Sequence, residues 1–434
     1  MNKVLPLFLF LFLITSCSLD QKSGIWTKPD KIENDKDFVI VELFKEEKKL
    51  DNELNSNVRI QLKSQLSKNN FSNDLSNNSG RVNYDGNLKT ISKYKFSKID
   101  NFNKFEPEMV FDQNNLIFFD NKGSILKFDQ FSKLIWKKNY YRKSEKKLKP
   151  VLNIASHGNY LIVTDNLAKY YVIDIESGNL LWMKSNIAPF NSQIKVYKDN
   201  FFVTDFQNIL RCYSIKDGEE VWNIKTDSSF IKSQKKLSLI ISDEKVYFNN
   251  SIGDISAVDI NRGKLVWQTP TQDSSIYESS FQLKTSDLVL ANKSILFSNN
   301  TNEFYSLDTK TGTLIWQQKI NSTVRPTAIG NFVFTVTEEG FLVIIESETG
   351  NIIRITNVFD RIKEKKRSNI KPIGFVVGSK NIYLTTSTGR LITIDISTGK
   401  PILMIKVDNK NISRPFILDK KLFIIKDSAI IKLD

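Results

Sequence analysis

The chain has 434 residues, of which 40% are hydrophobic and 11% are aromatic. This composition excludes a wholly disordered protein and supplies enough apolar side chains for a large core. The formal net charge of +14, from 62 Lys and Arg residues against 48 Asp and Glu residues, is compatible with a nucleic-acid or anionic partner. Solvated surface lysines are the simpler explanation, so we expect no nucleic-acid partner.

Residues 1–17 have the features of a signal peptide. Lys3 precedes the apolar run 5–14, which is too short and wrongly flanked for a membrane span. The small residues before Cys17 are similar to a bacterial lipobox, which implies cleavage before Cys17 and attachment of acyl chains to it. An ordinary signal peptide with an incidental cysteine is the alternative. Ser18, in place of an Asp, favours anchoring in the outer membrane, facing the periplasm.

Residues 18–80 are polar and rich in Asn, Ser, Lys and Asp. We expect them to form a tether between a lipid anchor and a folded body. Spaced apolar residues within this region give a weak indication of a short amphipathic helix over residues 38–50.

A turn followed by a Trp recurs along the rest of the chain. In each complete copy a Gly closes the turn and the Trp comes four residues later, as at Gly178–Trp182, Gly218–Trp222, Gly263–Trp267 and Gly312–Trp316. The copy that ends at Trp136 has Ser132 in place of the Gly, and three weaker copies keep the turn but have another residue at the Trp position: Thr90, Arg354 and Leu403. Successive Trp positions are 38 to 49 residues apart, which is typical of four-stranded propeller blades.

One repeat predicts all four strands of a blade, at residues 151–156, 159–164, 169–175 and 179–184. The turns between these strands are short and polar, as hairpins require. The Trp lies on the predicted outer strand, where a large aromatic side chain can pack between adjacent sheets. We therefore expect a structural role and extensive burial for the five repeat tryptophans: Trp136, Trp182, Trp222, Trp267 and Trp316.

The two ends of the repeat region complement each other. Residues 415–418, 422–425 and 429–433 predict the first three strands of a last blade, without a fourth. Residues 86–96 have a turn and an outer strand, without the three strands that should precede them. We therefore predict an all-β fold in which residues 81–434 form an eight-bladed propeller, with the N-terminal strand completing the last blade.

Few residues of the chain are suited to catalysis. His157 is the only histidine and lies in a predicted turn, whereas Cys212 lies in a predicted strand, where we expect a small buried side chain. Cys17 is the only other cysteine. With one histidine, placed in a turn, and no second cysteine beside Cys212, the sequence offers no Ser-His-Asp triad, Cys–His pair or zinc-binding cluster. We expect no catalytic residue and no metal site.

The turn-to-Trp unit, as in residues 258–267, resembles the repeat of the quinoprotein-like (PQQ-like) propeller family, and the resemblance covers residues 81–434. That family includes quinone-dependent dehydrogenases, which carry vicinal cysteines and a Glu/Asn/Asp calcium site. It also includes propeller lipoproteins of the outer-membrane β-barrel assembly (BAM) machinery. Cys17 and Cys212 cannot be vicinal, and no convincing calcium set is present. A lipobox, a polar tether and a single eight-bladed ring resemble the lipoproteins.

The resemblance to these lipoproteins implies a non-catalytic periplasmic scaffold that assists the folding and insertion of outer-membrane proteins. It implies no cofactor and no small-molecule substrate, and its protein partner would be a core subunit of the assembly machinery. A glycan- or peptidoglycan-binding propeller is the main alternative, and a quinoprotein dehydrogenase is a more remote one. A fold hosts many functions, so the resemblance alone does not decide among them.

Four of the predicted links between blades end in a basic residue followed by Pro. These links should share one face of the propeller, and Pro fixes the entry to an inner strand. We therefore expect four basic side chains near the mouth of the central channel, as candidates for binding an acidic surface of the partner: Lys149, Arg325, Lys371 and Arg414. The links 142–149 and 361–367 are also long and basic, although solvated loops are the alternative. Charge reversal of the last three candidates is expected to weaken partner binding with little change in stability.

Overall fold

The computed structural model describes residues 53–55, 57–62, 79–80, 82, 84–99, 107–227, 235–271 and 283–434. The chain divides into two units, residues 1–47 and 48–434, and every described residue belongs to the second. The predicted signal peptide, Cys17 and the helix expected over residues 38–50 therefore lie outside the described residues.

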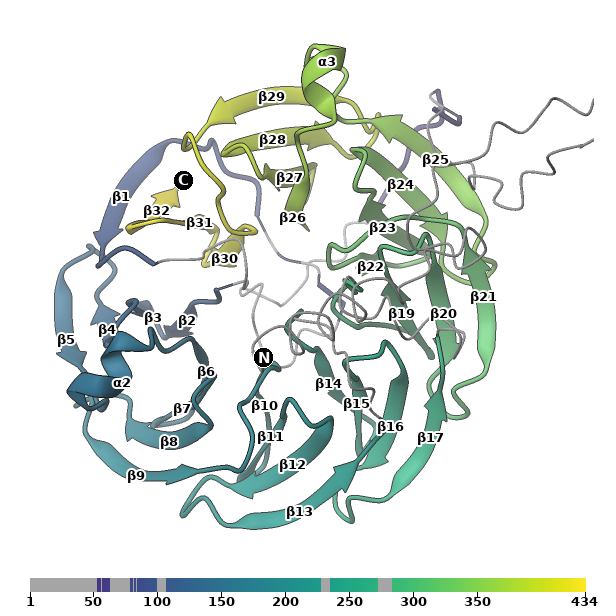
Figure 1. Cartoon of the computed structure of the whole chain (residues 1–434). Coiled ribbons are helices and arrows are strands. Elements are labelled where there is room, and N and C mark those ends of the chain that lie inside the picture. The colour runs from purple at the N-terminus through teal and green to yellow at the C-terminus, as the bar shows by residue number, and fades with distance from the viewer. Residues whose placement is uncertain are drawn as a thin grey trace, which may run out of the picture. The chain divides into compact units, whose positions relative to one another are not determined.

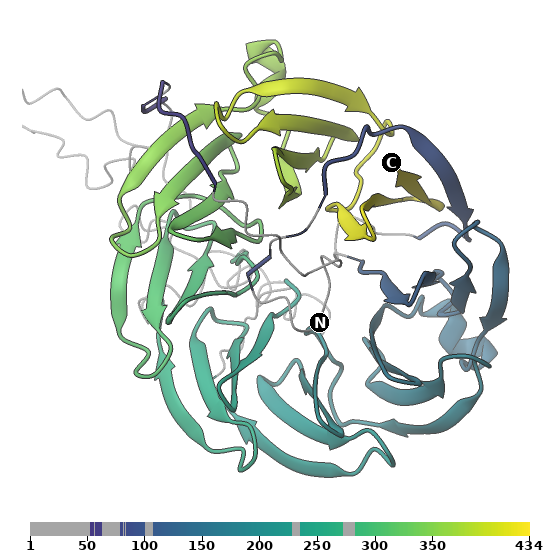
Figure 2. The same cartoon turned by 180° about the vertical axis from the view of Figure 1, so that it is seen from behind.

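The described residues form eight four-stranded antiparallel sheets, which are the blades of a β-propeller (Figure 1; seen from behind in Figure 2). In blades 1 to 7, four consecutive strands follow one another from the axis of the ring outward. Blade 1 consists of β2 (Val110–Asp112), β3 (Asn115–Phe119), β4 (Ile125–Phe128) and β5 (Leu134–Lys138). Blade 2 consists of β6 (Leu152–His157), β7 (Tyr160–Asp165), β8 (Lys169–Asp174) and β9 (Leu180–Ser185). The strands of blade 2 confirm the four predicted for that repeat to within about a residue.

Blades 3 to 6 repeat this arrangement. Blade 3 consists of β10 (Lys195–Tyr197), β11 (Asn200–Thr204), β12 (Ile209–Ser214) and β13 (Glu220–Lys225). Blade 4 consists of β14 (Leu239–Ser242), β15 (Lys245–Asn249), β16 (Ile255–Asp259) and β17 (Leu265–Thr269). Blade 5 consists of β18 (Val289–Ala291), β19 (Ser294–Ser298), β20 (Phe304–Asp308) and β21 (Leu314–Gln318). Blade 6 consists of β22 (Thr327–Ile329), β23 (Phe332–Val336), β24 (Phe341–Glu346) and β25 (Ile352–Asn357).

The last two blades close the ring. Blade 7 consists of β26 (Pro372–Val377), β27 (Asn381–Thr386), β28 (Arg390–Asp395) and β29 (Pro401–Lys406). Blade 8 consists of β30 (Phe416–Leu418), β31 (Lys421–Lys426), β32 (Ala429–Leu433) and the N-terminal strand β1 (Thr90–Lys95). β1 pairs antiparallel with β32, from Thr90 opposite Leu433 to Lys95 opposite Ala429. The predicted completion of the last blade by the N-terminal strand is confirmed, and it leaves no open seam in the ring.

Two short helices interrupt the links between blades. α2 (Lys143–Lys147) joins blades 1 and 2, α3 (Glu364–Arg367) joins blades 6 and 7, and neither helix has a buried residue. No helix in the described part of the chain has both the length and the apolar character needed to cross a membrane.

The two residues that define the repeat join each blade to the next. The turn Gly218 has φ +71°, and a Cβ there would lie 2.5 Å from the ring of Trp182 in the preceding blade. Gly312 has φ +72°, and a Cβ there would likewise lie 2.5 Å from the ring of Trp267 in the preceding blade. Only glycine tolerates both the positive φ and the close approach of the ring. We call this contact between a Trp and the next blade a seam.

Each of four seams also contains a hydrogen bond from the indole to a backbone carbonyl of the next blade. The Nε1 groups donate at 2.9 to 3.1 Å, from Trp182 to Ile215, from Trp222 to Ile260, from Trp267 to Thr309 and from Trp316 to Ser347. Trp136, Trp267 and Trp316 are buried, as predicted, whereas Trp182 and Trp222 keep part of their surface exposed. The Trp therefore serves both as apolar packing and as a polar link between sheets.

The seam between blades 6 and 7 has Arg354 in place of the Trp. The Arg354 side chain is fully buried. Its Nη1 donates to the Ser397 carbonyl of blade 7 at 3.0 Å, much as a seam indole would, and also to the Val58 carbonyl at 2.6 Å. The substitution of Arg for Trp therefore coincides with the place where a segment from outside the repeats reaches the ring.

That segment comprises the described residues among 53–62, which we call the N-terminal strap. Leu54 and Ile355 of β25 form an antiparallel bridge, with N–H···O distances of 3.2 and 3.0 Å. Ile60 donates its N–H to the Ser397 carbonyl at 3.0 Å, and its side chain is buried in the core of blades 6 and 7. The strap thus adds backbone hydrogen bonds and apolar burial to one seam only.

A second N-terminal stretch contacts the inside of the ring before β1 begins. The Ser79 carbonyl accepts a hydrogen bond from Ala328 N of the inner strand β22 at 3.0 Å. Tyr84 is fully buried and packs edge-on against Tyr383, with ring centroids 4.7 Å apart. Its backbone carbonyl accepts a hydrogen bond from Ser379 N. Both contacts lie at blades 6 and 7.

Candidate functional site

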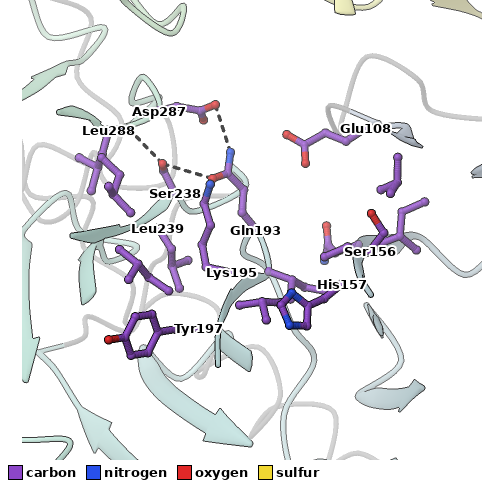
Figure 3. Close-up of a pocket in the computed structure, with 18 of the residues that line it drawn as sticks. Glu108, Ser156, His157, Gln193, Lys195, Tyr197, Ser238, Leu239, Asp287 and Leu288 are labelled. Carbon is purple, nitrogen blue, oxygen red and sulfur yellow. Dashed lines mark hydrogen bonds between the residues drawn. The ribbon is translucent and has the colours of Figure 1, made fainter. Parts of the chain in front are cut away.

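A cavity of about 620 Å³ lies at the centre of the ring, and Figure 3 shows some of the side chains that line it. It is lined by the inner strands of blades 1 to 4 and by residues that precede the inner strands of blades 5, 6 and 8. One end, where the links enter the inner strands, carries a group of ionisable residues that we call the mouth cluster: Glu108, Lys195, Lys236, Asp287, Arg325 and Arg414. The opposite end, where the inner strands turn back, carries the exposed residues His157, Asp243 and Glu244.

Arg414 lies between the two carboxylates of the mouth cluster. Its Nη1 is 2.9 Å from Asp287 Oδ2, and its Nη2 contacts Glu108 Oε1. Lys236 Nζ is 2.9 Å from Glu108 Oε2, and Gln193 Nε2 donates to Asp287 Oδ2 at 3.1 Å. All four charged side chains are largely buried. Each carboxylate therefore has two donors, as buried charges require.

The two carboxylates stay ionised despite their burial. Burial alone would raise the pKa of Glu108, but Lys236 and Arg414 outweigh it and hold that pKa below its ordinary value. Burial acts in the same direction on Asp287, where Arg414, Lys235 and Arg325 hold the pKa well below the usual range. The ion pairs therefore persist at neutral pH.

The remaining cations of the cluster are Lys195, at the start of β10, and Arg325, just before β22. Burial and the nearby Arg325 lower the pKa of Lys195 to about 8. Burial likewise lowers the pKa of Arg325, whose charge the carboxylates Asp287 and Glu108 favour. Among the described residues that line the mouth of the cavity, four cations accompany two carboxylates.

The structure separates the four basic residues that were predicted to gather at the channel mouth. Arg325 and Arg414 line the cavity, but Lys149 and Lys371 are exposed and do not. Lys371 Nζ lies 3.4 Å from Glu338 Oε2 at the surface. The expectation that charge reversal leaves stability unchanged does not suit Arg414, because a Glu there would place three carboxylates together in a largely buried site.

The links between blades share one face with the turns between the second and third strands of the blades. Glu145 of α2 forms an ion pair with Lys169 at 2.7 Å, and Lys371 lies beside Glu338, so two links each contact such a turn. We call this face the link face. It includes the short helices α2 and α3, which are rich in Lys and Arg and have no buried residue. It can attract an acidic surface, with a strength that falls as salt rises.

The two residues with conventional catalytic chemistry are not brought together. Cys212 is a free cysteine, fully buried in β12 as expected, and burial raises the pKa of its thiol to about 12. His157 is exposed at the end of β6. No group of three or more His, Cys, Asp or Glu residues suited to holding a metal ion occurs among the described residues.

Sequence reasoning did not single out Glu108, Lys195, Lys236 or Asp287. All four lie in or beside links, which vary in length and do not follow the repeat. The Arg-Pro pairs at Arg325 and Arg414 were the one usable signal, because Pro marks the entry to an inner strand. The acidic partners of Arg414 come from residues 127 and 306 positions away, and no local pattern joins them.

Comparison with known proteins identifies a matching family. Residues 98–356 and 364–434 match the model of the family described as outer membrane protein assembly factor BamB. A curated relative from Shewanella oneidensis, also an outer membrane protein assembly factor BamB, is 26% identical over 166 residues. That match covers 36% of this chain, and the chain spans about two fifths (39%) of the relative's length.

Many solved structures are similar in fold, and two of them illustrate the range of their functions. BamB from Moraxella catarrhalis matches with a TM-score of 0.65 and 14% identity, over 80% of this chain and 100% of that chain. A quinohemoprotein alcohol dehydrogenase from Comamonas testosteroni matches with a TM-score of 0.63 and 10% identity, over 85% of this chain and 81% of that chain. At these identities the likeness shows the propeller fold alone, and the fold is shared by an assembly factor and an enzyme.

Proposed function

The chain belongs to the family of the outer membrane protein assembly factor BamB, and from this premise we propose that it is a non-catalytic scaffold of the outer-membrane β-barrel assembly machinery. In this role it would dock to a core subunit of the machinery and assist the folding and insertion of outer-membrane proteins. The observation that carries the proposal is the family match, which extends over residues 98–356 and 364–434 and so includes strands of all eight blades.

The residues of this chain favour a scaffold over a dehydrogenase. Cys212 is buried, with the pKa of its thiol raised, and the sequence holds only one other cysteine. The two carboxylates at the cavity mouth, Glu108 and Asp287, are engaged by Arg414 and its neighbours. A carboxylate held in an ion pair is poorly placed to act as a base or as a calcium ligand.

The link face is the surface that best suits docking. It carries exposed basic residues at Lys149 and Lys371 and along α2 and α3. Exposed charges of this kind raise the rate and selectivity of association with an acidic surface more than they raise affinity. We propose that the partner presents an acidic surface to this face.

Anchoring completes the proposed arrangement. Acylation of Cys17 would hold the chain at the outer membrane, with the propeller in the periplasm. Two or three acyl chains bind a membrane firmly, whereas one binds it only marginally. The N-terminal strap, which belongs to the tether predicted over residues 18–80, is bonded to blades 6 and 7.

Affinity capture from detergent-solubilised membranes tests the docking role. The tagged full-length chain should co-purify with the core subunit of the assembly machinery, and identification of the captured proteins gives the readout. The double variant Lys149→Glu, Lys371→Glu should capture less of it. The matched control is Lys216→Glu, Lys310→Glu, which reverses two exposed lysines in turns of the opposite face. Equal capture by wild type and both double variants would contradict the choice of face, and capture of no assembly subunit by wild type would contradict the function.

A further inference from the structure

Two large hydrophobic side chains on the link face are left unexplained by docking through charge. Ile187, in the link between blades 2 and 3, is 87% exposed, and Leu148, which directly follows α2, is 64% exposed. Among the described residues, only Phe131 is comparably exposed, and it lies in a turn of the opposite face. Apolar side chains that gather in one place on a surface mark a site of interaction.

The links that carry these two side chains are fixed to the same turn of blade 2, between β7 and β8. The residue before Ile187 donates its backbone N–H to the Ala168 carbonyl at 2.7 Å. Glu145 of α2, the helix that precedes Leu148, forms its ion pair with the neighbouring Lys169. The two links therefore form one surface, which we call the blade 2 patch: Lys143, Lys146, Lys147, Leu148 and Ile187.

This patch is basic, and its nearest carboxylate is already engaged. Residues 142–149 include five Lys or Arg residues and one acidic residue, Glu145. Glu145 pairs with Lys169 and also accepts a hydrogen bond from Arg142 N at 2.7 Å. Residues 186–194, which form the link with Ile187, include no acidic residue. The patch can therefore attract an anionic surface.

A lipid surface suits this combination better than an acidic protein does. Four of the five basic residues in 142–149 are Lys, which is depleted at protein interfaces, where Arg and aromatic side chains are enriched. Anionic lipids attract Lys and Arg alike. A headgroup layer also accepts exposed apolar side chains without a matching pocket. The link 361–367 around α3 has the same number of basic residues but no exposed large hydrophobic side chain, so only the blade 2 patch combines the two features.

We propose that the blade 2 patch binds the surface of an anionic phospholipid membrane, with Ile187 and Leu148 inserted among the headgroups and the lysines of α2 against the lipid phosphates. This contact goes beyond the proposed docking to a protein subunit, and it is separate from the lipid anchor at Cys17. An acyl chain and a basic patch together hold a protein at a membrane more firmly than one acyl chain does. The contact would also orient the ring, with the blade 2 side of the link face towards the lipid.

Co-sedimentation with vesicles tests the patch in the chain of residues 18–434, which lacks Cys17 and keeps all eight blades. The vesicles contain either equal parts of phosphatidylglycerol and phosphatidylcholine or phosphatidylcholine alone. We expect binding to the anionic vesicles that weakens as salt rises, and much weaker binding to the neutral ones. The double variant Leu148→Ser, Ile187→Ser should weaken binding to anionic vesicles about 10-fold or more. Lys143→Gln, Lys147→Gln should weaken it about 10-fold to 30-fold.

Two controls separate the patch from the rest of the surface. Phe131→Ser removes an apolar side chain that is 77% exposed on the opposite face, and it should bind vesicles like wild type. Lys365→Gln, Lys366→Gln removes two exposed lysines of α3 and should weaken binding less than the matching change in α2. All the changed side chains are exposed, so we expect every variant to melt like wild type.

The outcomes distinguish this proposal from the docking function. Equal vesicle binding by wild type and both patch variants, or equal binding to anionic and neutral vesicles, would overturn the membrane contact. So would a Leu148→Ser, Ile187→Ser variant that binds vesicles like wild type but no longer captures the assembly subunit, because the patch would then contact a protein. None of these results contradicts docking itself, which is tested with Lys149 and Lys371 in the capture experiment.

Discussion

The seams between blades and the mouth of the central cavity are built on different principles. A seam uses two residues of the repeat, a turn Gly and a Trp, and one hydrogen bond from the indole to the next blade. The mouth uses charged residues from links that do not follow the repeat, joined by ion pairs across the axis. The repeated residues therefore hold the sheets together, whereas the links supply the ion pairs at the mouth of the cavity.

Arg354 combines a position of the repeat with a buried charge. It occupies a Trp position of the repeat, yet it is a buried cation that binds backbone carbonyls on two sides. Because a guanidinium has more donors than an indole, one residue can link blade 6 both to blade 7 and to the N-terminal strap. Because Arg replaces Trp at this position, the seam between blades 6 and 7 is also bonded to the N-terminal strap.

The largest effect is expected from removal of the closing strand. Deletion of residues 84–98 removes β1, and with it the antiparallel pairing with β32 and the buried Tyr84 and Tyr94. The ring would then have an open edge, so we expect loss of cooperative folding or a large fall in melting temperature. A deletion within residues 18–50 is the control and should melt like wild type. If the chain without residues 84–98 melted like wild type, closure by β1 would not stabilise the ring.

Truncation of a seam Trp should be the next largest effect. Trp316→Ala removes a buried indole that packs on Gly350 and donates to Ser347, and it should lower the free energy of unfolding by about 3–5 kcal/mol. Trp182→Ala should cost less, because Trp182 is partly exposed. Chemical denaturation of the two variants measures the difference. A cost for Trp182→Ala equal to or above that for Trp316→Ala would show that burial does not set the strength of a seam.

At the mouth, Arg414→Gln should lower the free energy of unfolding by about 3 kcal/mol, because it removes the cation that Glu108 and Asp287 share. The stabilisation of these carboxylates depends on pH. The pKa values of both are lowered in the folded chain, so the stabilisation is complete above the ordinary carboxyl pKa and is lost as pH falls through the lower native values.

Denaturation curves at a series of pH values check this prediction. In Arg414→Gln the native pKa values should rise, so the variant should depend less on pH in the acidic range than wild type does. Lys371→Gln is the control, since it removes an exposed cation and should change stability by no more than about 0.5 kcal/mol. Parallel curves for wild type and Arg414→Gln would mean that Arg414 does not set the ionisation of the pair.

The smallest effect should come from the seam that contains Arg354. Arg354→Met removes the hydrogen bonds to Ser397 and Val58, at a cost of about 1–3 kcal/mol. Arg354→Trp should restore a seam of the common kind and retain more stability than Arg354→Met, but it should still release the strap. Hydrogen exchange at Leu54 and Ile60, whose N–H groups are bonded to the ring, gives the readout. Unchanged protection of these amides in both variants would contradict the role of Arg354 in holding the strap.

The fold could be predicted from the sequence because the seam residues repeat. The turn and the position four residues after it mark each blade, although only four copies have both the Gly and the Trp. The missing fourth strand of the last blade matches the unaccompanied strand at residues 90–95. The strap could not be predicted in this way. Leu54, Val58 and Ile60 bond to the ring through backbone groups, which carry no sequence pattern. The side chains of Glu53 and Asn55 also bond to the ring, at backbone groups of Asn357 and Ile353, but they belong to no repeat.

The mouth cluster was predicted only in part, for a related reason. Arg325 and Arg414 were found through the Pro that follows each, and the same signal also selected Lys149 and Lys371, which the structure leaves at the surface. Pro fixes where the backbone enters a strand, but it does not fix the direction of the preceding side chain. The pairing of Arg414 with Glu108 and Asp287 depends on closure of the ring, which brings residues from three blades to one place.

The claim that this chain serves outer-membrane protein assembly is tested most directly by the amount of folded outer-membrane protein in cells that lack it. Folded barrels migrate differently from unfolded ones on gels of unheated membranes, so their amount can be compared between cells with and without the chain. We predict less folded barrel protein in its absence, restored by the wild-type chain and not by Cys17→Ala, which would lack the lipid anchor. Equal amounts of folded barrel protein with and without the chain would contradict the account.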